Sequence, residues 1–130
     1  MSAILEIQTN GPGLYEFTDR LHEHAAGDGV MTIFVRHTSC SLLVQENADP
    51  DVRTDLDRFM ARLVPDGDAL FEHTAEGPDD MPAHVRAILT NMDLTVPVAN
   101  GKCALGTWQG IYLFEHRNAP HRREVAALLR

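Results

Sequence analysis

Histidines and carboxylates gather in three short polar segments of this chain, and both residue types can bind metals or exchange protons. The segments are 37–50, 73–84 and 106–117. Each lies where a predicted strand or helix begins or ends, and folds often place functional side chains at such positions. If folding brings the segments together, they form one site rich in imidazole and carboxylate groups. Metal binding or acid–base catalysis is therefore the leading hypothesis.

The best candidates for metal ligands are His73, His84 and His116. Imidazole nitrogen binds zinc and other first-row metals, and three such ligands leave a position open for water or substrate. His73 precedes a predicted helix, His84 lies in its first turn, and His116 ends a predicted strand. The spacing allows these residues to share a site, but histidines at such positions are more often surface or hydrogen-bonded residues.

The acidic residues of the second segment have two explanations. Asp79 and Asp80 precede an apolar helical pattern, so they can cap the helix through its free backbone amides. Together with Glu76 they can also orient the histidines, or hold a magnesium ion that bridges to a phosphate. The two roles are compatible.

The first segment contains further candidates for catalysis. Asp49 has the position of a helix N-cap before Pro50, whereas Glu46 and Asn47 have no evident structural role and are stronger functional candidates. His37 lies at the junction of two predicted strands. Cys40 is three residues further along an extended segment and would point to the opposite face, so we expect a buried thiol and no nucleophile.

The third segment interrupts a strand with Gly106 and Gly110, which favours a bulge or a close approach of backbone or ligand. One interpretation is a sheet bend that Trp108 covers. The other is a pocket wall in which Thr107 and Gln109 bind the substrate. Arg117 can likewise neutralise an anionic substrate or form an ion pair with Glu115, and the sequence leaves both choices open.

Length and composition limit the class of protein. The 130 residues fit one domain, 1–130, and 44% hydrophobic with 23% charged residues is an ordinary globular balance. A formal net charge of -8 with scattered basic residues argues against a nucleic-acid partner. No signal-like start and no apolar run of membrane-spanning length occur, so we expect a cytoplasmic protein without a membrane partner. Its two cysteines, Cys40 and Cys103, are expected to be reduced thiols.

Hydrophobic periodicity predicts an α+β fold in which a mostly antiparallel sheet packs with about three helices. Asn100-Gly101 is a strong hairpin signal between two of the strands. The expected strands are 4–7, 30–35, 40–44, 94–98, 103–114 and 122–129, with a short strand or loop at 69–73. The expected helices are 14–25, 50–63 and 79–92. Their predicted buried faces include Val52, Leu56, Phe59, Met60 and Leu63 in the second, and Met81, Val85, Ile88, Leu89 and Met92 in the third.

Three motifs resemble the signatures of the YjbQ family, and the similarity covers nearly the whole chain. They are 37–40 with 46–50, then 76–84, and finally 105–117. The second and third motifs are long and specific. Cys40 stands where relatives often have a small residue such as alanine, and this departure also speaks against a cysteine nucleophile.

The resemblance implies a compact α+β fold, commonly a homotrimer, with the motif residues near a subunit boundary and a divalent metal among the histidines. It also implies a thiamine-phosphate synthase activity, a transferase reaction that joins a pyrimidine diphosphate to a thiazole phosphate and releases pyrophosphate. This activity can be a secondary one. The metal would be zinc at the histidines, or magnesium with a phosphorylated substrate.

We therefore expect an enzyme that acts on a small phosphorylated molecule. A metal-dependent hydrolase and a non-catalytic protein that binds a small molecule or a metal are the alternatives. The residues expected to take part in catalysis are His37, Glu46, Asn47, Asp49, Glu76, Asp80, His84 and Arg117. The residues expected to contact the substrate are Thr38, Thr107, Trp108 and Gln109.

Overall fold

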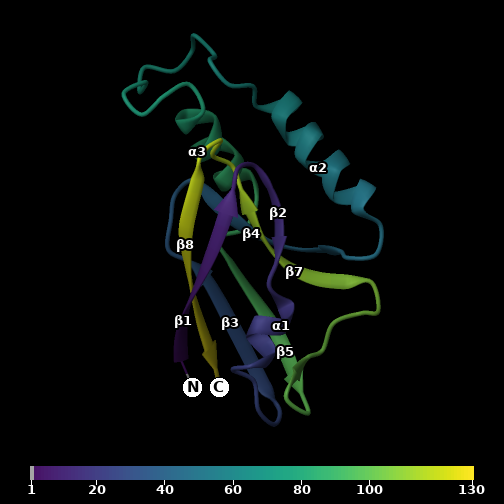
Figure 1. Ribbon diagram of the computed structural model, residues 1–130. Helices are drawn as coiled ribbons and strands as arrows, with labels where there is room; N and C mark the ends of the chain where they lie inside the picture. Colours follow the sequence, from purple (N-terminus) through teal and green to yellow (C-terminus); the bar gives the residue numbers. More distant parts are fainter. Residues whose placement is uncertain (1) are drawn as a thin grey trace.

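Two antiparallel sheets form most of the computed structural model, which describes residues 2–130 (Figure 1). The five-stranded sheet has the order β1 (Ser2–Asn10), β8 (Pro120–Leu129), β3 (Gly29–Val35), β5 (Asp93–Ala99) and β6 (Lys102–Cys103). The three-stranded sheet has the order β2 (Gly13–Glu16), β7 (Gln109–Glu115) and β4 (Cys40–Glu46). The described helices are α1 (Thr18–His22), α2 (Pro50–Leu63) and α3 (Asp80–Leu89). The predicted α+β fold with a mostly antiparallel sheet is confirmed.

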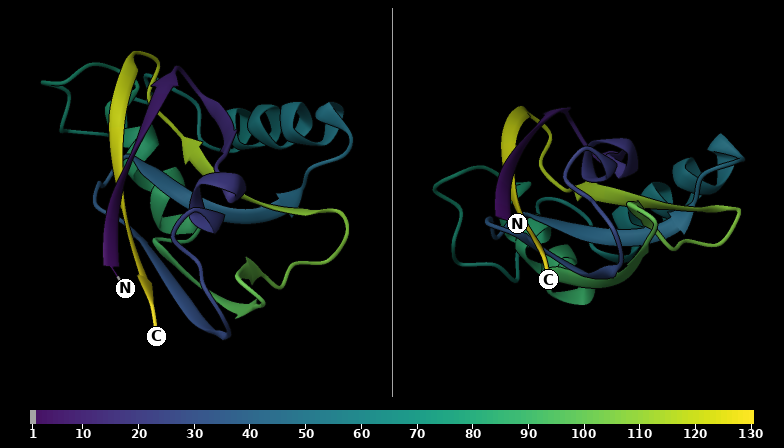
Figure 2. Two further views of the ribbon diagram at one scale, coloured as in Figure 1. Left: turned by 60° about the horizontal axis from the view of Figure 1, so that its bottom comes forward. Right: turned by 90° about the horizontal axis from the view of Figure 1, so that it is seen from below.

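The hydrophobic core lies between the two sheets, which curl around it (Figure 2). Alternation along each strand supplies it, because successive side chains of a strand point to opposite faces. In β1 the buried residues are Leu5, Ile7 and Thr9, and the residues between them are exposed. Leu42 and Leu113 reach the same core from the other sheet.

The helices differ in how they contact this core. α3 packs on β4 through Ala83 and Ala87, which are buried. α2 lies at the side of the molecule, where it contacts β2 and where Arg53 donates to Glu46 O and the Tyr112 hydroxyl, and it has no buried residue (Figures 1 and 2). Within one chain the predicted buried face of α2 is wrong, since Phe59 is 51% exposed. The predicted face of the third helix is wrong in part: Ile88 is 78% exposed, whereas Met92, beyond the end of α3, packs against the core. Among residues 2–130, no helix combines the length and apolar character needed to cross a bilayer.

Turn and cap chemistry was predicted correctly where the local signal was strong. Asn100 and Gly101 have φ angles of 52° and 76°, the left-handed conformations of a tight hairpin turn. Asp49 caps α2, since its Oδ1 accepts a hydrogen bond of 2.9 Å from Asp51 N. Asp79 precedes α3 but makes no side-chain cap hydrogen bond, so the capping explanation of this residue is wrong.

Two predicted segments differ from the structure, and a third was left open by the sequence. The predicted helix 14–25 is split into β2 and α1, because β2 pairs with β7 and the Tyr15 hydroxyl donates to Gly11 O. Residues 69–73 form a loop, which is one of the two alternatives that the sequence left open. The predicted strand 103–114 is interrupted by a loop that follows Cys103, and the chain becomes a strand again at Gln109, where β7 begins.

Candidate functional site

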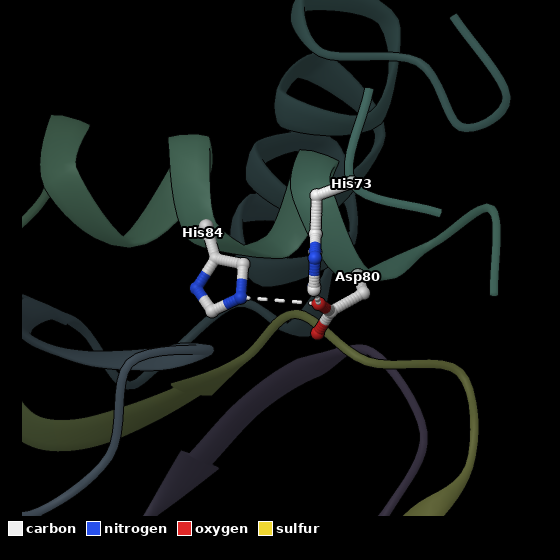
Figure 3. Close-up of side chains that lie close together, drawn as sticks. All are labelled: His73, Asp80 and His84. Carbon is white, nitrogen blue, oxygen red and sulfur yellow. Dashed lines mark hydrogen bonds and ion pairs between the residues drawn. The ribbon is translucent and has the colours of Figure 1, made fainter. Parts of the chain in front are cut away.

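A cluster of two imidazoles and one carboxylate, formed by His73, Asp80 and His84, is the candidate site (Figure 3). His73 Nε2 lies 3.0 Å and His84 Nε2 lies 3.1 Å from the same atom, Asp80 Oδ2. Asp80 is buried, His84 is partly exposed, and His73 is about half exposed. The three ligand atoms lie within 4.8 Å of one another. Among residues 2–130 no other group of His, Cys, Asp or Glu side chains meets this criterion.

Local structure explains how these side chains meet. Asp80 and His84 are one helical turn apart at the start of α3, so they lie on the same face of the helix. His73 belongs to the segment 65–79, whose two ends are joined by a hydrogen bond from Gly67 N to Pro78 O. The segment is thus a compact loop that returns His73 to the beginning of α3.

The contacts of His84 indicate which of its ring nitrogens could bind a cation. Its Nδ1 lies 3.0 Å from Thr38 O, a carbonyl that can only accept, so Nδ1 carries a hydrogen. In the neutral ring the lone pair is then on Nε2, and it faces the carboxylate oxygen of Asp80. Two lone pairs at 3.1 Å repel each other unless a proton or a metal ion lies near them.

The donor set fits a transition metal better than magnesium. Two imidazoles and one carboxylate are the ligands of several catalytic zinc sites and of other first-row metal sites, whereas magnesium prefers oxygen ligands. The contact of His84 with Thr38 O is the kind of interaction that fixes the orientation of a ligating imidazole. His73, Asp80 and His84 would hold the metal, and the exposed side of the cluster would leave positions for water or substrate.

Arg117 holds the acidic residues in place. Its Nε donates to Asp79 Oδ2 at 2.9 Å, its Nη1 to Asp80 Oδ1 at 2.9 Å, and its Nη2 to Glu76 O at 3.0 Å. Burial acts to raise the pKa of Asp79, but hydrogen bonds from Arg117 and from Asn118 N bring this pKa below its usual value. Because all three guanidinium nitrogens are used here, Arg117 positions Asp80 and does not form the alternative side-chain pair with Glu115.

A buried ion pair supports the cluster from within the fold. Glu115 and Arg123 are both buried, and Arg123 Nε donates to Glu115 Oε1 at 2.8 Å. Glu115 Oε2 also accepts from the backbone N of Arg117, while Arg123 Nη2 donates to Ser39 Oγ. Burial acts to raise the pKa of Glu115, but hydrogen bonds from Arg123 and Thr9 lower it overall. The pair thus fixes the two segments, around Ser39 and Arg117, that contact His84 and Asp80.

His116 does not join the expected trio of ligands. It is buried, its Nε2 lies 2.9 Å from Ser41 Oγ, and its Nδ1 has no hydrogen-bond partner. Burial, followed by the positive charge of Arg86, lowers the pKa of His116 to about 3, so the ring is neutral near pH 7. Asp80 takes the position in the trio that we expected for His116. The missed signal was the spacing of Asp80 and His84, one turn apart on a helix.

A second group of predicted site residues lies at the other end of β4 and β7. These strands pair in antiparallel register from Cys40↔Glu115 to Glu46↔Gln109. Seven extended residues span roughly 20 Å, so Glu46 and Gln109 are far from His84 within one chain. The residues of the second group are Glu46, Asn47, Asp49, Thr107, Trp108 and Gln109.

The contacts of this second group are mainly structural within one chain. Asn47 N donates to Trp108 O at 2.9 Å, and Gln109 Oε1 accepts from Gly106 N at 2.8 Å. Trp108 is 64% exposed, so it covers neither a pocket nor the core here. Thr107 is exposed as well. Glu46 differs from the others, because its Oε2 is buried and has no hydrogen-bond partner.

The remaining candidates have separate positions. His37 Nε2 accepts a hydrogen bond of 2.7 Å from Glu124 N, and burial followed by the charge of Arg123 lowers the pKa of His37. Cys40 is fully buried, and burial raises its pKa to about 12, so the expected structural thiol is confirmed. Glu76 is near the cluster, with its carboxylate 3.9 Å from Arg117 Nη1. Thr38 contributes its backbone carbonyl.

The chain is similar to a family model, to several known proteins and to solved structures. A family model described as UPF0047 protein YjbQ-like matches residues 3–129. The UPF0047 protein sll1880 of Synechocystis sp. is 51% identical over 126 residues, which is 94% of this chain and 86% of that protein. The UPF0047 protein YjbQ of Salmonella typhimurium is 40% identical over 122 residues, 90% of this chain and 88% of that protein. The crystal structure of the conserved hypothetical protein TT1486 from Thermus thermophilus is similar with a TM-score of 0.92 and 35% identity, over 98% of this chain and 99% of that one.

Proposed function

The chain belongs to the YjbQ-like UPF0047 protein family, and from this premise we propose that it is a metal-dependent enzyme that acts on a small phosphorylated substrate. The observation that carries the proposal is the meeting of His73 Nε2 and His84 Nε2 at Asp80 Oδ2. A divalent cation bound by all three side chains would suit this arrangement of two imidazole nitrogens around one carboxylate oxygen.

A phosphorylated substrate would need a bound metal in this acidic chain. The chain has a formal net charge of -8, so an anionic substrate needs a local positive charge to approach. Arg117 cannot supply it freely, because its guanidinium already donates to Asp79, Asp80 and Glu76 O. A bound divalent ion would supply charge that stabilises a leaving phosphate or diphosphate. His73, Asp80 and His84 would hold that ion, and His73 and His84 are partly exposed, so substrate could reach it.

The specific reaction that we propose is thiamine-phosphate synthesis, either as the main or as a secondary activity. A bond forms between the thiazole nitrogen and the methylene carbon of the pyrimidine, and the bond from that carbon to the diphosphate oxygen breaks. The electron pair of the broken bond leaves with pyrophosphate. This assignment rests on the resemblance of the three motifs, and the metal cluster is compatible with it.

Removal and return of the metal test the function. We expect the zinc-loaded protein to form thiamine phosphate and pyrophosphate from the two precursors. Treatment with a chelator should lower the rate at least about 100-fold, and added Zn²⁺ should restore it. Product formation that is insensitive to chelation would contradict a metal-dependent reaction.

The same assay separates the two alternatives. A metal-dependent hydrolase would release pyrophosphate and the pyrimidine alcohol without any coupled product. A non-catalytic binding protein would bind zinc and a precursor but release neither product. Mass spectrometry of the reaction mixture distinguishes all three outcomes.

We further propose that the chain forms a homotrimer, and two exposed apolar faces support this assembly. One face is on α2 and includes Val52, Leu56 and Phe59, which line a hollow of 720 Å³. The other is on the outer side of the five-stranded sheet, where Phe34 and Ile4 are each 50% exposed. If the α2 face of one copy packs on the sheet face of the next, each copy uses two different faces. Such contacts form a closed ring of three when each copy is rotated by a third of a turn from the last.

Molar mass in solution tests the assembly. We expect light scattering to give three times the 14.4 kDa mass of one chain. Phe59→Asp and Phe34→Asp should each shift the protein to the mass of a single chain, because a charge would be buried at the contact. Leu70→Asp is the matched control, since Leu70 is 78% exposed and lies on neither face. A wild-type protein with the mass of one chain would contradict the homotrimer.

A further inference from the structure

A small hollow lies directly beside the histidine and carboxylate cluster. It has a volume of 310 Å³ and lies between the loop 65–79 and the first turn of α3. His73 belongs to both, because its side chain lines the hollow and its Nε2 contacts Asp80. Met81, which follows Asp80, forms another part of the wall. A molecule in the hollow therefore has one end next to the candidate metal ligands.

The lining of the hollow is unsuitable for an anionic group. Neither lysine nor arginine is among its lining residues, and Asp68 is its one carboxylate. The nearby guanidinium of Arg117 donates to Asp79, Asp80 and Glu76 O. An anion in the hollow would lose its hydration without gaining an opposite charge. The anionic part of a substrate therefore belongs outside the hollow, at the cluster.

The size and chemistry of the wall suit a single small ring. A volume of 310 Å³ is at the lower end of the range for ligand pockets, roughly 300–1,000 Å³. Phe71 and Met81 are half-buried and offer an aromatic face and a polarisable thioether. Asp68 and Thr74 add hydrogen-bonding oxygens, and the carboxylate favours an amine or a protonated ring nitrogen.

We propose that this hollow binds the uncharged or cationic ring of the substrate, and that the phosphate of the same molecule reaches the metal at His73, Asp80 and His84. The inference rests on the proposed function and names its substrate class: a small ring, neutral or positively charged, that carries a phosphate group. It also assigns Phe71 and Asp68 to substrate recognition. Neither residue belongs to the three motifs that carry the family resemblance.

Three ring compounds of similar size test this site: benzylamine, benzyl alcohol and benzoate. They are titrated into isotopically labelled protein that has been stripped of divalent metal, so that benzoate cannot bind through zinc. We expect amide signals of the loop 65–79 to shift, with benzylamine binding at least about 10-fold tighter than benzoate. Equal or tighter binding of benzoate would overturn the proposal.

Variants of the wall locate the binding site. Phe71→Ala should lower the affinity for benzylamine at least about 10-fold, because the aromatic contact is lost. Ala69→Trp should lower it as much, because the larger side chain fills the hollow. Asp68→Asn should remove the advantage of benzylamine over benzyl alcohol and leave benzyl alcohol unaffected. Ile88→Ala is the control and should bind like the wild type, because Ile88 is 78% exposed on α3 and does not line the hollow. Unchanged benzylamine affinity in both Phe71→Ala and Ala69→Trp would refute the assignment.

Zinc titration of the same variants separates the two proposals. Phe71→Ala and Ala69→Trp should bind zinc with wild-type affinity, because neither changes a ligand. Zinc binding without ring binding would refute the hollow as a subsite and leave the metal site intact. Ring binding by a protein that does not bind zinc would instead contradict the proposed function, and with it the link between ring and phosphate.

Discussion

Asp80→Asn lowers the affinity for zinc at least about 100-fold, which is the largest effect that we expect from a single substitution. Asp80 Oδ2 is the atom that both imidazoles contact, at 3.0 and 3.1 Å. An amide has no charge to offer the metal, and its NH₂ group can replace the ligating oxygen. Competition with a chromophoric chelator measures the affinity, and the rate of thiamine-phosphate synthesis should fall in parallel. Wild-type zinc affinity in Asp80→Asn would exclude this cluster as the metal site.

Asp79→Asn is the matched comparison for that experiment. Both carboxylates accept one hydrogen bond of 2.9 Å from Arg117, but only Asp80 contacts the imidazoles. The substitution at position 79 therefore disturbs Arg117 and retains all three ligands. We expect Asp79→Asn to lower the affinity for zinc by about 10-fold at most. If Asp79→Asn lowered the zinc affinity as much as Asp80→Asn, the loss would come from the displacement of Arg117. Asp80 would then not be shown to be a metal ligand.

The second large effect is a loss of stability in mild acid, caused by His116. The ring is 1% exposed, and its pKa is lowered to about 3 by burial and then by Arg86. The unfolded chain takes up a proton near the ordinary value of 6.5, whereas the folded chain does not. The free energy of unfolding is therefore highest above pH 6.5 and decreases as the pH falls from 6.5 toward 3. The shift of the pKa from 6.5 to about 3 corresponds to about 5 kcal/mol of unfolding free energy, which is lost in full only below pH 3.

Urea unfolding between pH 7 and 5 isolates this contribution, because Glu115 and Asp79 have lowered pKa values and lose their stabilising charge only at lower pH. We expect His116→Gln to reduce the pH dependence near pH 5 by about 1.4 kcal/mol per pH unit. His37 has the same direction of shift and leaves part of the slope in place. Equal slopes in His116→Gln and the wild type would show that folding does not lower the pKa of His116.

The local signals of the sequence were sufficient for most elements but not for their buried faces. Asp49-Pro50 predicted the start of α2, and Asn100-Gly101 predicted the turn between β5 and β6. These features depend on backbone conformations that a few residues determine. The apolar periodicity of α2 predicted a helix correctly but not its position, because α2 has no buried residue within one chain. Periodicity identifies an apolar face, and it does not identify what covers that face.

The candidate site was predicted in part. His73 and His84 do lie together, with ring centres 6.3 Å apart, as their positions around the start of α3 suggested. The prediction of His116 as the third ligand was wrong. His116 follows the last residue of β7, and whether its ring enters the core or the site depends on how β7 packs against α3 and β4. No pattern of nearby residues carries that information.

The sequence by itself determined the family, the α+β class, and the residue types that can bind a metal, since these depend on motifs and local periodicity. The tertiary structure alone decided which residues meet. The antiparallel register of β4 and β7 puts Thr38 and Arg117 at one end and Glu46 with Gln109 at the other. Register is set by long-range packing of the whole sheet, because a strand offers the same hydrogen-bonding groups at every position. Strand pairing therefore divided one predicted site into two groups, and the return of the loop 65–79 to α3 brought His73 to Asp80 and His84.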